Sequence, residues 1–289
     1  MRLLVFGGWG QLGTDLFEIG SQRGHEVVRP RHSDVDVTDG AGVEGVAHET
    51  EPGAIVNAAA FHKTEWCEDQ PEQAFRVNAV GALNVGRAAA SAKARCVFVS
   101  SDYVFDGARA SGYAEDDPVA PVNVYGASKV AGELAVRMAC PGWMVVRGSS
   151  MFGHAGSSGK GGNFVETMLA KAAAGEDIAV VDDLTFAPTS TRDMAERVIM
   201  LLERDAPPAV YHLANAGSCS WLEFARQIFD LAGVQANLLP RRSDQDRVRR
   251  PRSSILLDTR TAGLGLPPAR SWEEALGRYL EGRTAALQG

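Results

Sequence analysis

Short apolar runs alternate with segments of helical periodicity through the first half of the chain. Apolar residues recur at helical spacing after Leu12, across residues 73–92 and across residues 128–138. The runs that predict β-strands are residues 3–6, 25–29, 52–58, 96–100 and 144–147. Strands that alternate with helices indicate βαβ units, whose right-handed crossovers favour a doubly wound, Rossmann-like parallel sheet. The sequence therefore predicts an α/β fold.

The alternation becomes less regular after residue 148. Glycine and serine dominate residues 153–162, which predicts a loop. The pattern further predicts helices at residues 163–173, 189–203 and 220–232 and strands at residues 178–182 and 210–214. We predict two units, a doubly wound domain of residues 1–149 with about 177–213 and a smaller α/β lobe of residues 150–176 with about 214–289.

The chain of 289 residues is 45% hydrophobic and 22% charged, which are the proportions of a globular protein. Its apolar runs fall far short of the roughly 18 residues of a membrane span, and its start lacks the apolar core of a signal peptide. A net charge of −7 disfavours nucleic acid as a partner. The four cysteines are isolated from one another, so they fit a reducing cytoplasm and form no metal-binding motif. We expect a cytoplasmic protein without a membrane, nucleic-acid or metal partner.

Three glycines, Gly7, Gly10 and Gly13, follow the first predicted strand and open the first predicted helix. In this position glycines allow a tight turn and let backbone N–H groups approach a pyrophosphate at the helix N-terminus. Because the chain has 31 glycines, this spacing is expected by chance about 0.4 times. The position directly after a strand is therefore the stronger argument. A tight turn without a ligand is the alternative interpretation.

Arg29 ends the second predicted strand and Arg31 follows it, at the place where an acidic residue binds the ribose in a typical NAD site. A basic cluster there suits a 2′-phosphate and favours NADPH over NADH. Solvated loop arginines are the alternative. Asp36 lies further along the chain than the acid of a typical NAD site.

Tyr125 and Lys129 stand four residues apart in a predicted helix, which places the phenol and the ammonium on one face. The chain has five tyrosines and five lysines, so this spacing is expected by chance about 0.1 times. A nearby cation lowers the pKa of a tyrosine, which would make Tyr125 a proton donor near neutral pH. Ser101 adds a hydroxyl at the end of a predicted strand, where doubly wound sheets bind ligands. An ordinary surface pair is the alternative for Tyr125 and Lys129.

Several motifs resemble the extended short-chain dehydrogenase/reductase superfamily, and most closely its dTDP-4-dehydrorhamnose reductase family. The resemblance covers essentially the whole chain. Its motifs are Gly-Gly-Trp-Gly-Gln-Leu-Gly at residues 7–13, Asp-Val-Thr-Asp at 36–39, Val-Asn-Ala-Ala-Ala at 56–60, Val-Asn-Ala at 77–79, Ser-Asp-Tyr-Val-Phe-Asp-Gly at 101–107, Asn-Val-Tyr-Gly-Ala-Ser-Lys at 123–129, Gly-Asn-Phe-Val at 162–165, Ala-Pro-Thr-Ser at 187–190 and Arg-Pro at 250–251.

The resemblance implies reduction of the 4-keto group of a nucleotide-activated 6-deoxy sugar, with NADPH as the cofactor and NADH as a second option. It implies that Tyr125 is the general acid, Lys129 its electrostatic partner and ribose anchor, and Ser101 the hydroxyl that orients the carbonyl. The residues expected at the cofactor are Gly7, Gly10, Gln11, Leu12, Gly13, Arg29, Arg31, Asp36, Val37, Ala58, Ala59, Ala60, Tyr125 and Lys129. The residues expected at the substrate are Ser101, Asp102, Tyr103, Asn163, Phe164 and Arg250.

By the same resemblance, the larger domain would bind NAD(P) and the smaller lobe would bind the nucleotide sugar. Residues 241–252 carry six arginines against two aspartates. This basic segment suits a diphosphate, and a solvated arginine loop is the alternative. A homodimer is an open alternative to a monomer.

Two departures from the family pattern leave the substrate open. Ser101 stands where relatives usually carry threonine, which keeps the hydroxyl, and Ser150 stands where they usually carry tryptophan, which removes an aromatic wall. His62 lies in a loop that also differs, and it either contacts a substrate or is a solvated bystander. A sugar-nucleotide epimerase and a non-catalytic NADP-binding subunit, similar to the regulatory β subunit of methionine adenosyltransferase, stay as alternatives. A dehydratase is disfavoured because Tyr103, and not a glutamate, follows Asp102.

Overall fold

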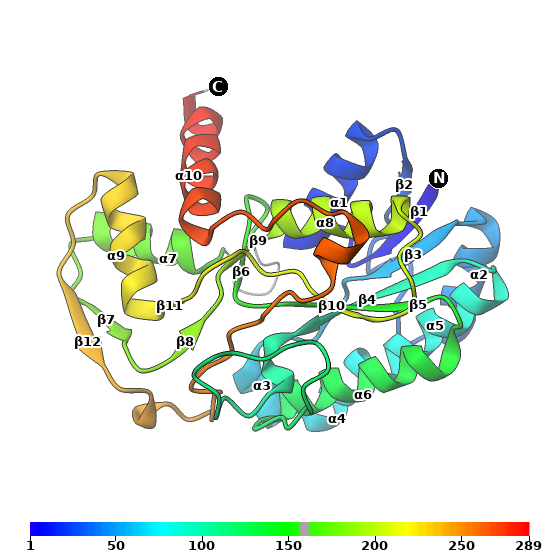
Figure 1. Ribbon diagram of the computed structural model, residues 1–289, viewed down its shortest axis with the longest axis horizontal. Helices are drawn as coiled ribbons and strands as arrows, with labels where there is room; N and C mark the ends of the chain where they lie inside the picture. Colours follow the sequence, from blue (N-terminus) through cyan, green and yellow to red (C-terminus); the bar gives the residue numbers. More distant parts are fainter. Residues whose placement is uncertain (157–161, 289) are drawn as a thin grey trace.

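A parallel sheet with helices on both faces forms the larger part of the protein (Figure 1). The computed structural model describes residues 1–156 and 162–288. Within them the sheet has six strands in the order β10-β5-β4-β3-β1-β2. Its strands are β1 (Arg2–Phe6), β2 (Glu26–Val28), β3 (Ala54–Asn57), β4 (Arg95–Ser101), β5 (Trp143–Gly148) and β10 (Val210–His212). The predicted doubly wound α/β fold is confirmed.

Two apolar clusters hold helices to the two faces of this sheet. On one face Leu16 packs with Met194, and on the other Val85 packs with Val136. The helices are α1 (Gln11–Gln22) and α8 (Thr191–Glu203) on the first face, and α2 (Gly40–Thr50), α5 (Gly81–Ser91) and α6 (Val124–Ala139) on the second. Because both faces are covered, every residue of β3 is buried, which explains the continuous apolar run in the sequence.

The helix predicted across residues 73–92 is interrupted. After α3 (Thr64–Asp69), the chain forms α4 (Pro71–Phe75), a π-helix (Arg76–Val80) and then α5. The π-helix carries the buried Asn78, whose side-chain amide donates to Phe61 O and Ser128 Oγ at 2.9 Å each. A π-turn inside a helix often marks a functional site, and here it ties α6 to the loop that follows β3. Apolar periodicity alone does not reveal the interruption.

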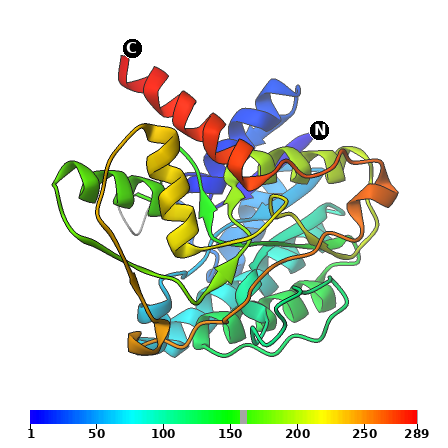
Figure 2. The same ribbon diagram turned by 60° about the vertical axis from the view of Figure 1, so that its left-hand side comes forward.

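A smaller group of elements surrounds a third apolar cluster at the other end of the molecule (Figure 2). Its elements are α7 (Phe164–Ala173), β7 (Ile178–Val181), α9 (Trp221–Ala232), β12 (Leu238–Arg241) and α10 (Trp272–Gln288). Strand β7 pairs with β12 in parallel, and Ile178 and Val180 belong to this cluster. The division of the chain into two units stays a prediction. The prediction assigns residues 178–181 to the larger domain, whereas these contacts favour placing β7 in the smaller unit.

Short elements connect the two groups. They are β6 (Met151–Phe152) paired with β9 (Thr189–Ser190), β8 (Thr185–Phe186) paired with β11 (Cys219–Ser220), and the 3-10 turns Asp102–Val104, Ser243–Gln245 and Thr261–Leu264. The predicted loop at residues 153–162 lies partly outside the described residues. In the described part of the chain, no helix is both long and apolar enough to cross a membrane.

Besides the short α3, two longer helices were not predicted from the sequence. Helix α2 contains three glycines, which lower helix propensity, yet Val43 and Ala47 anchor it in the core. Helix α10 buries Leu276 and Tyr279 against the smaller cluster. In both helices tertiary packing outweighs the local signal.

Candidate active site

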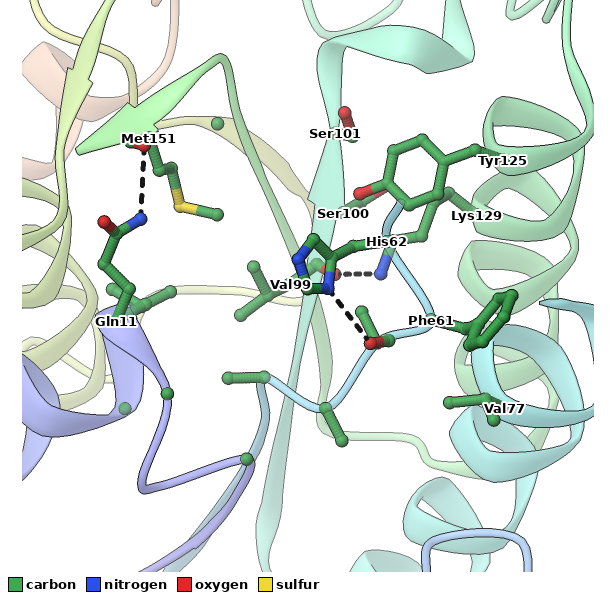
Figure 3. A pocket seen from close by; sticks show the side chains of 18 of the residues that line it. Gln11, Phe61, His62, Val77, Val99, Ser100, Ser101, Tyr125, Lys129 and Met151 are labelled. Carbon is green, nitrogen blue, oxygen red and sulfur yellow. Dashed lines mark hydrogen bonds between the residues drawn. The ribbon is translucent and has the colours of Figure 1, made fainter. Parts of the chain in front are cut away.

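A cavity of about 930 Å³ opens beyond the carboxyl ends of β1, β3 and β4 (Figure 3). Phe164, Trp221 and Phe224 of the smaller group line its far side. Doubly wound sheets bind ligands in this position, and the volume lies in the upper part of the range of about 300–1,000 Å³ typical of ligand sites. Among the described residues, no three His, Cys, Asp or Glu side chains are arranged to hold a metal ion.

The turn between β1 and α1 needs its glycines. Gly7 has a φ of +73°, and a Cβ there would lie 2.6 Å from the backbone of Ala58. A Cβ on Gly13 would lie 2.3 Å from the carbonyl oxygen of Gly7. Gly10 is the N-cap of α1 and has no side chain that could cap the first turn, so the N–H groups of that turn are available to an anion. The turn therefore fits the pyrophosphate of a dinucleotide.

Tyr125 is presented by the first turn of α6. Asn123 caps this helix by accepting a hydrogen bond from Gly126 N at 2.8 Å, and a Cβ on Gly126 would lie 2.1 Å from Tyr103 O. The close approach brings the Tyr125 ring edge-on to Tyr103, with 5.8 Å between centroids. The Ser101 side chain lies near enough to the Tyr125 phenol to lower its pKa, against the larger opposing effect of burial.

Lys129 lies one helical turn below Tyr125 and is 1% exposed. Its Nζ donates to Val99 O at 2.5 Å and stands 4.2 Å from the Phe98 ring centroid. Burial lowers the pKa of Lys129 to about 7, against an opposing contribution from Glu133. Burial also raises the pKa of Tyr125. The lowered pKa of Tyr125 that the Tyr125–Lys129 spacing predicts is therefore not seen in this structure, because desolvation of the phenol dominates.

The buried lysine makes the stability of the ligand-free protein depend on pH. Between the folded pKa of about 7 and the ordinary value of 10.5, the unfolded chain holds a proton that the folded chain has lost, so the free energy of unfolding rises with pH. We expect wild type to gain more stability than Lys129→Met between about pH 7 and about pH 9 in urea unfolding. The same pH dependence in both proteins would contradict this.

Asp102 is buried beside the proposed proton donor and is 2% exposed. Its carboxylate accepts hydrogen bonds from Ser101 Oγ at 2.8 Å and Ser149 Oγ at 2.7 Å, and the Ser254 hydroxyl is near enough to affect its pKa. Burial raises its pKa, and these three hydroxyls oppose that shift. Asp102 therefore acts on the site through Ser101, whose side chain it orients.

A buried ion pair stands behind Lys129. Arg147 Nε and Nη2 donate to the two carboxylate oxygens of Glu133 at 2.8 and 2.7 Å. Ser100 Oγ donates to the same carboxylate at 2.6 Å, and His212 Nε2 lies 3.3 Å from Arg147 Nη1. Burial, with the Arg147 charge second, lowers the pKa of His212 to about 4. This bidentate ion pair between Arg147 and Glu133 joins β5 to α6 directly below the site.

Most residues expected at the cofactor line the cavity. They are Gly7, Gly10, Gln11, Leu12, Gly13, Asp36, Val37, Ala58, Ala59, Ala60, Tyr125 and Lys129. Arg29 and Arg31 are not among the lining residues. The Arg29 guanidinium lies 3.9 Å from the Trp9 ring centroid and 3.8 Å from that of Phe17, and Arg31 lies 4.3 Å from that of Trp9. Trp9 itself lines the cavity, so both arginines stand beside its rim.

The residues expected at the substrate all line the cavity, but Asn163 is already engaged. The expected residues are Ser101, Asp102, Tyr103, Asn163, Phe164 and Arg250. Asn163 caps α7, and its amide nitrogen lies 2.9 Å from Gly153 O, 3.1 Å from Tyr279 Oη and 3.3 Å from Gln11 Oε1. Asn163 therefore links the glycine turn to α10.

The cavity wall also includes Trp221, which was not predicted there, and Ser150 and His62, whose roles the sequence leaves open. Trp221 stacks on Phe186 with 4.1 Å between centroids and packs against Phe164 at 4.6 Å. Ser150 lines the cavity with a strained φ of +40°. His62 points into the cavity between Gln11 and Tyr125 (Figure 3). The apolar periodicity after Trp221 predicts helix α9, but it does not indicate which face of that helix reaches the cavity.

Comparison with known proteins identifies close relatives over the whole chain. Residues 1–284 match the family described as the RmlD substrate binding domain. A spore coat polysaccharide biosynthesis protein, SpsK of Bacillus subtilis, is 36% identical over 287 residues, with 99% of both chains covered. A dTDP-4-dehydrorhamnose reductase of Mycolicibacterium smegmatis is 36% identical, covering 95% of this chain and 84% of the relative. The structure of a Bacillus anthracis dTDP-4-dehydrorhamnose reductase with NADP superposes with a TM-score of 0.92 at 35% identity, covering 97% of this chain and 99% of that one.

A doubly wound fold with Ser101 at the end of β4 and Tyr125 and Lys129 on α6, all lining one cavity, is that of the extended short-chain dehydrogenase/reductase class. The resemblance to dTDP-4-dehydrorhamnose reductases seen in the motifs is confirmed. Within that class, the chain belongs to the RmlD substrate binding domain family.

Proposed function

We propose that this protein reduces the 4-keto group of a nucleotide-activated 6-deoxy sugar, with NADPH as the cofactor and NADH as its alternative. Support comes from relatives that are named dTDP-4-dehydrorhamnose reductases, one of which was solved with NADP. The observation that carries the proposal is the convergence of Ser101, Tyr125 and Lys129 on one wall of a cavity that starts at the glycine turn.

The cofactor end of the cavity fits a dinucleotide. The N–H groups of the first turn of α1 would hold the pyrophosphate, and Ala58 to Ala60 would lie along the ribose and nicotinamide. Arg29 and Arg31 would meet a 2′-phosphate at the Trp9 rim. When bound, NADPH supplies the hydride.

The chain supplies the proton and the electrostatic support. As the carbonyl oxygen gains charge, the O–H bond of Tyr125 breaks and its proton moves to that oxygen. The Ser101 hydroxyl, which donates to Asp102 in this structure, would turn to donate to the same substrate oxygen and so stabilise the developing alkoxide. The ammonium form of Lys129 stabilises the phenolate left on Tyr125, and Lys129 would also bind the ribose.

The substrate end combines one arginine with aromatic surfaces. Arg250 lines the cavity beside Tyr103 and would bind the substrate diphosphate. Phe164 and Trp221 offer ring surfaces to the nucleotide base. Because the Asn163 amide is bonded within the protein, Asn163 would shape this end without binding the substrate itself.

Turnover of nucleotide sugars tests the proposal directly. We expect the protein to oxidise NADPH when it is mixed with dTDP-4-dehydrorhamnose. The reaction is measured as the loss of absorbance of the reduced nicotinamide, and we expect a lower rate with NADH. Conversion of the sugar without net oxidation of NADPH would identify an epimerase. Cofactor binding without conversion of any 4-keto-6-deoxy sugar, together with a copurifying partner protein, would identify a regulatory subunit.

A further inference from the structure

Arg250 is already engaged by two carboxylates at the cavity wall. Its Nη1 lies 3.0 Å from Oδ2 of Asp246, and its Nη2 forms an ion pair with Oε1 of Glu65. Thr64 Oγ1 lies 3.4 Å from the same Nη2, and Tyr103 lines the cavity beside this guanidinium, whose charge lowers the pKa of Tyr103 against the larger effect of burial. One positive charge thus faces two negative charges at the place where a diphosphate would bind.

The two carboxylates differ in how firmly they are held. Asp246 belongs to the same segment as Arg250, is 17% exposed, and accepts a second ion pair from Arg241 at 2.8 Å. Glu65 comes from α3, its side chain is 47% exposed, and it also accepts a hydrogen bond from the adjacent Thr64 at 3.1 Å. Glu65 can therefore turn into solvent, whereas Asp246 would have to break a second ion pair.

The contact lies between two separate segments and next to the reacting groups. The segment of residues 246–250 passes beside α3, where Arg247 also pairs with Asp69 (Figure 1). Tyr103 lines the cavity together with Arg250 and packs edge-on against Tyr125. A change of partner at Arg250 therefore takes place one side chain away from the proposed proton donor.

We propose that Glu65 is a specificity-determining residue, which occupies Arg250 until the diphosphate of a nucleotide ligand takes its place. The inference rests on the proposed function, in which Arg250 binds that diphosphate. A diphosphate carries more charge and more acceptor oxygens than one carboxylate, so it displaces Glu65. A ligand without phosphate leaves the Glu65–Arg250 ion pair intact and gains nothing from the arginine. The ion pair thus selects for strongly anionic ligands, because a ligand that cannot displace the Glu65 carboxylate gains no contact with Arg250.

Loss of the Glu65 charge should tighten binding of the nucleoside diphosphate. We expect Glu65→Gln, loaded with NADP, to bind dTDP about 3- to 10-fold more tightly than wild type in calorimetric titration. Affinity for thymidine, which has no phosphate, should not change. In the Arg250→Met background the gain from Glu65→Gln should disappear, because no guanidinium is left to be released.

A second carboxylate of α3 provides the matched control. Asp69 pairs with Arg247 and lies on the same short helix, so Asp69→Asn removes the same charge without touching Arg250. We expect its dTDP affinity to equal that of wild type. An equal gain in Asp69→Asn would overturn the proposal, because net charge alone would then explain the effect. Unchanged or weaker dTDP binding by Glu65→Gln would also overturn it.

Inorganic pyrophosphate separates this inference from the proposed function. If the protein does not reduce dTDP-4-keto sugars but Glu65→Gln binds pyrophosphate more tightly through Arg250, the partner exchange stands and the substrate assignment falls. If the protein reduces the sugar and Glu65→Gln binds neither dTDP nor pyrophosphate more tightly, the function stands and the exchange falls.

Discussion

Replacing Tyr125 with phenylalanine is expected to lower kcat for the 4-keto sugar by about 10²- to 10⁴-fold, the usual contribution of a positioned general acid. The ring would still fill its place against Tyr103, while the carbonyl oxygen would lose its proton donor. The Kd for NADPH should stay within a few-fold of wild type, because the pyrophosphate is held at the glycine turn. Steady-state oxidation of NADPH and fluorescence titration measure the two effects.

Tyr211→Phe serves as the control for removing a tyrosine hydroxyl. Tyr211 is the central residue of β10 and is 1% exposed, and its hydroxyl donates to Pro207 O at 2.7 Å. We expect its kcat to match wild type. Turnover of Tyr125→Phe at the wild-type rate would remove Tyr125 from the proton transfer. If Tyr125→Phe instead lost NADPH binding, the result would show that the Tyr125 phenol holds the cofactor.

Replacing Arg147 with methionine is expected to lower the free energy of unfolding by about 3–5 kcal/mol, the usual cost of leaving one charge of a buried pair unpaired. Arg147 and Glu133 are 3% and 4% exposed, so the remaining carboxylate could not reach water. Urea unfolding followed by circular dichroism would record the loss as a lower midpoint.

Two further variants define the origin of that loss. Arg147→Met combined with Glu133→Leu should recover most of the stability, because an apolar pair of similar volume can replace a buried ion pair. Glu26→Gln breaks the exposed pair with Arg2, in which the side chains are 63% and 39% exposed, and should cost no more than about 1 kcal/mol. A double variant as unstable as Arg147→Met alone would point to lost packing and not to the unpaired charge.

The sheet and the centre of the site follow from local patterns in the sequence. Strand β4 is buried along nearly its whole length, so it appears as a continuous apolar run. Tyr125 and Lys129 share a face of any regular helix, and the glycine turn depends on neighbouring residues alone. Each of these features is set by contacts within a few residues, which a sequence pattern records.

The closure of the cavity depends on contacts between distant segments. Arg250 reaches the cavity from an irregular segment, and its partner Glu65 lies 185 residues earlier in the chain. The motif around Asn163 indicated a substrate contact, whereas the fold commits its amide to Gly153 and Tyr279. Local periodicity contains no information about which of these distant side chains meet.

Strand β5 pairs on its outer side with β10, and β5 ends at Gly148 whereas β10 begins at Val210. A ribosome-bound chain that has been made only as far as β5 therefore presents an open sheet edge, whose unpaired N–H and C=O groups can pair with another chain. Parallel pairing across such a separation also forms slowly, because a long loop must close first. We therefore expect the β5 edge of the nascent chain to be prone to aggregation until synthesis of β10 allows that edge to be covered.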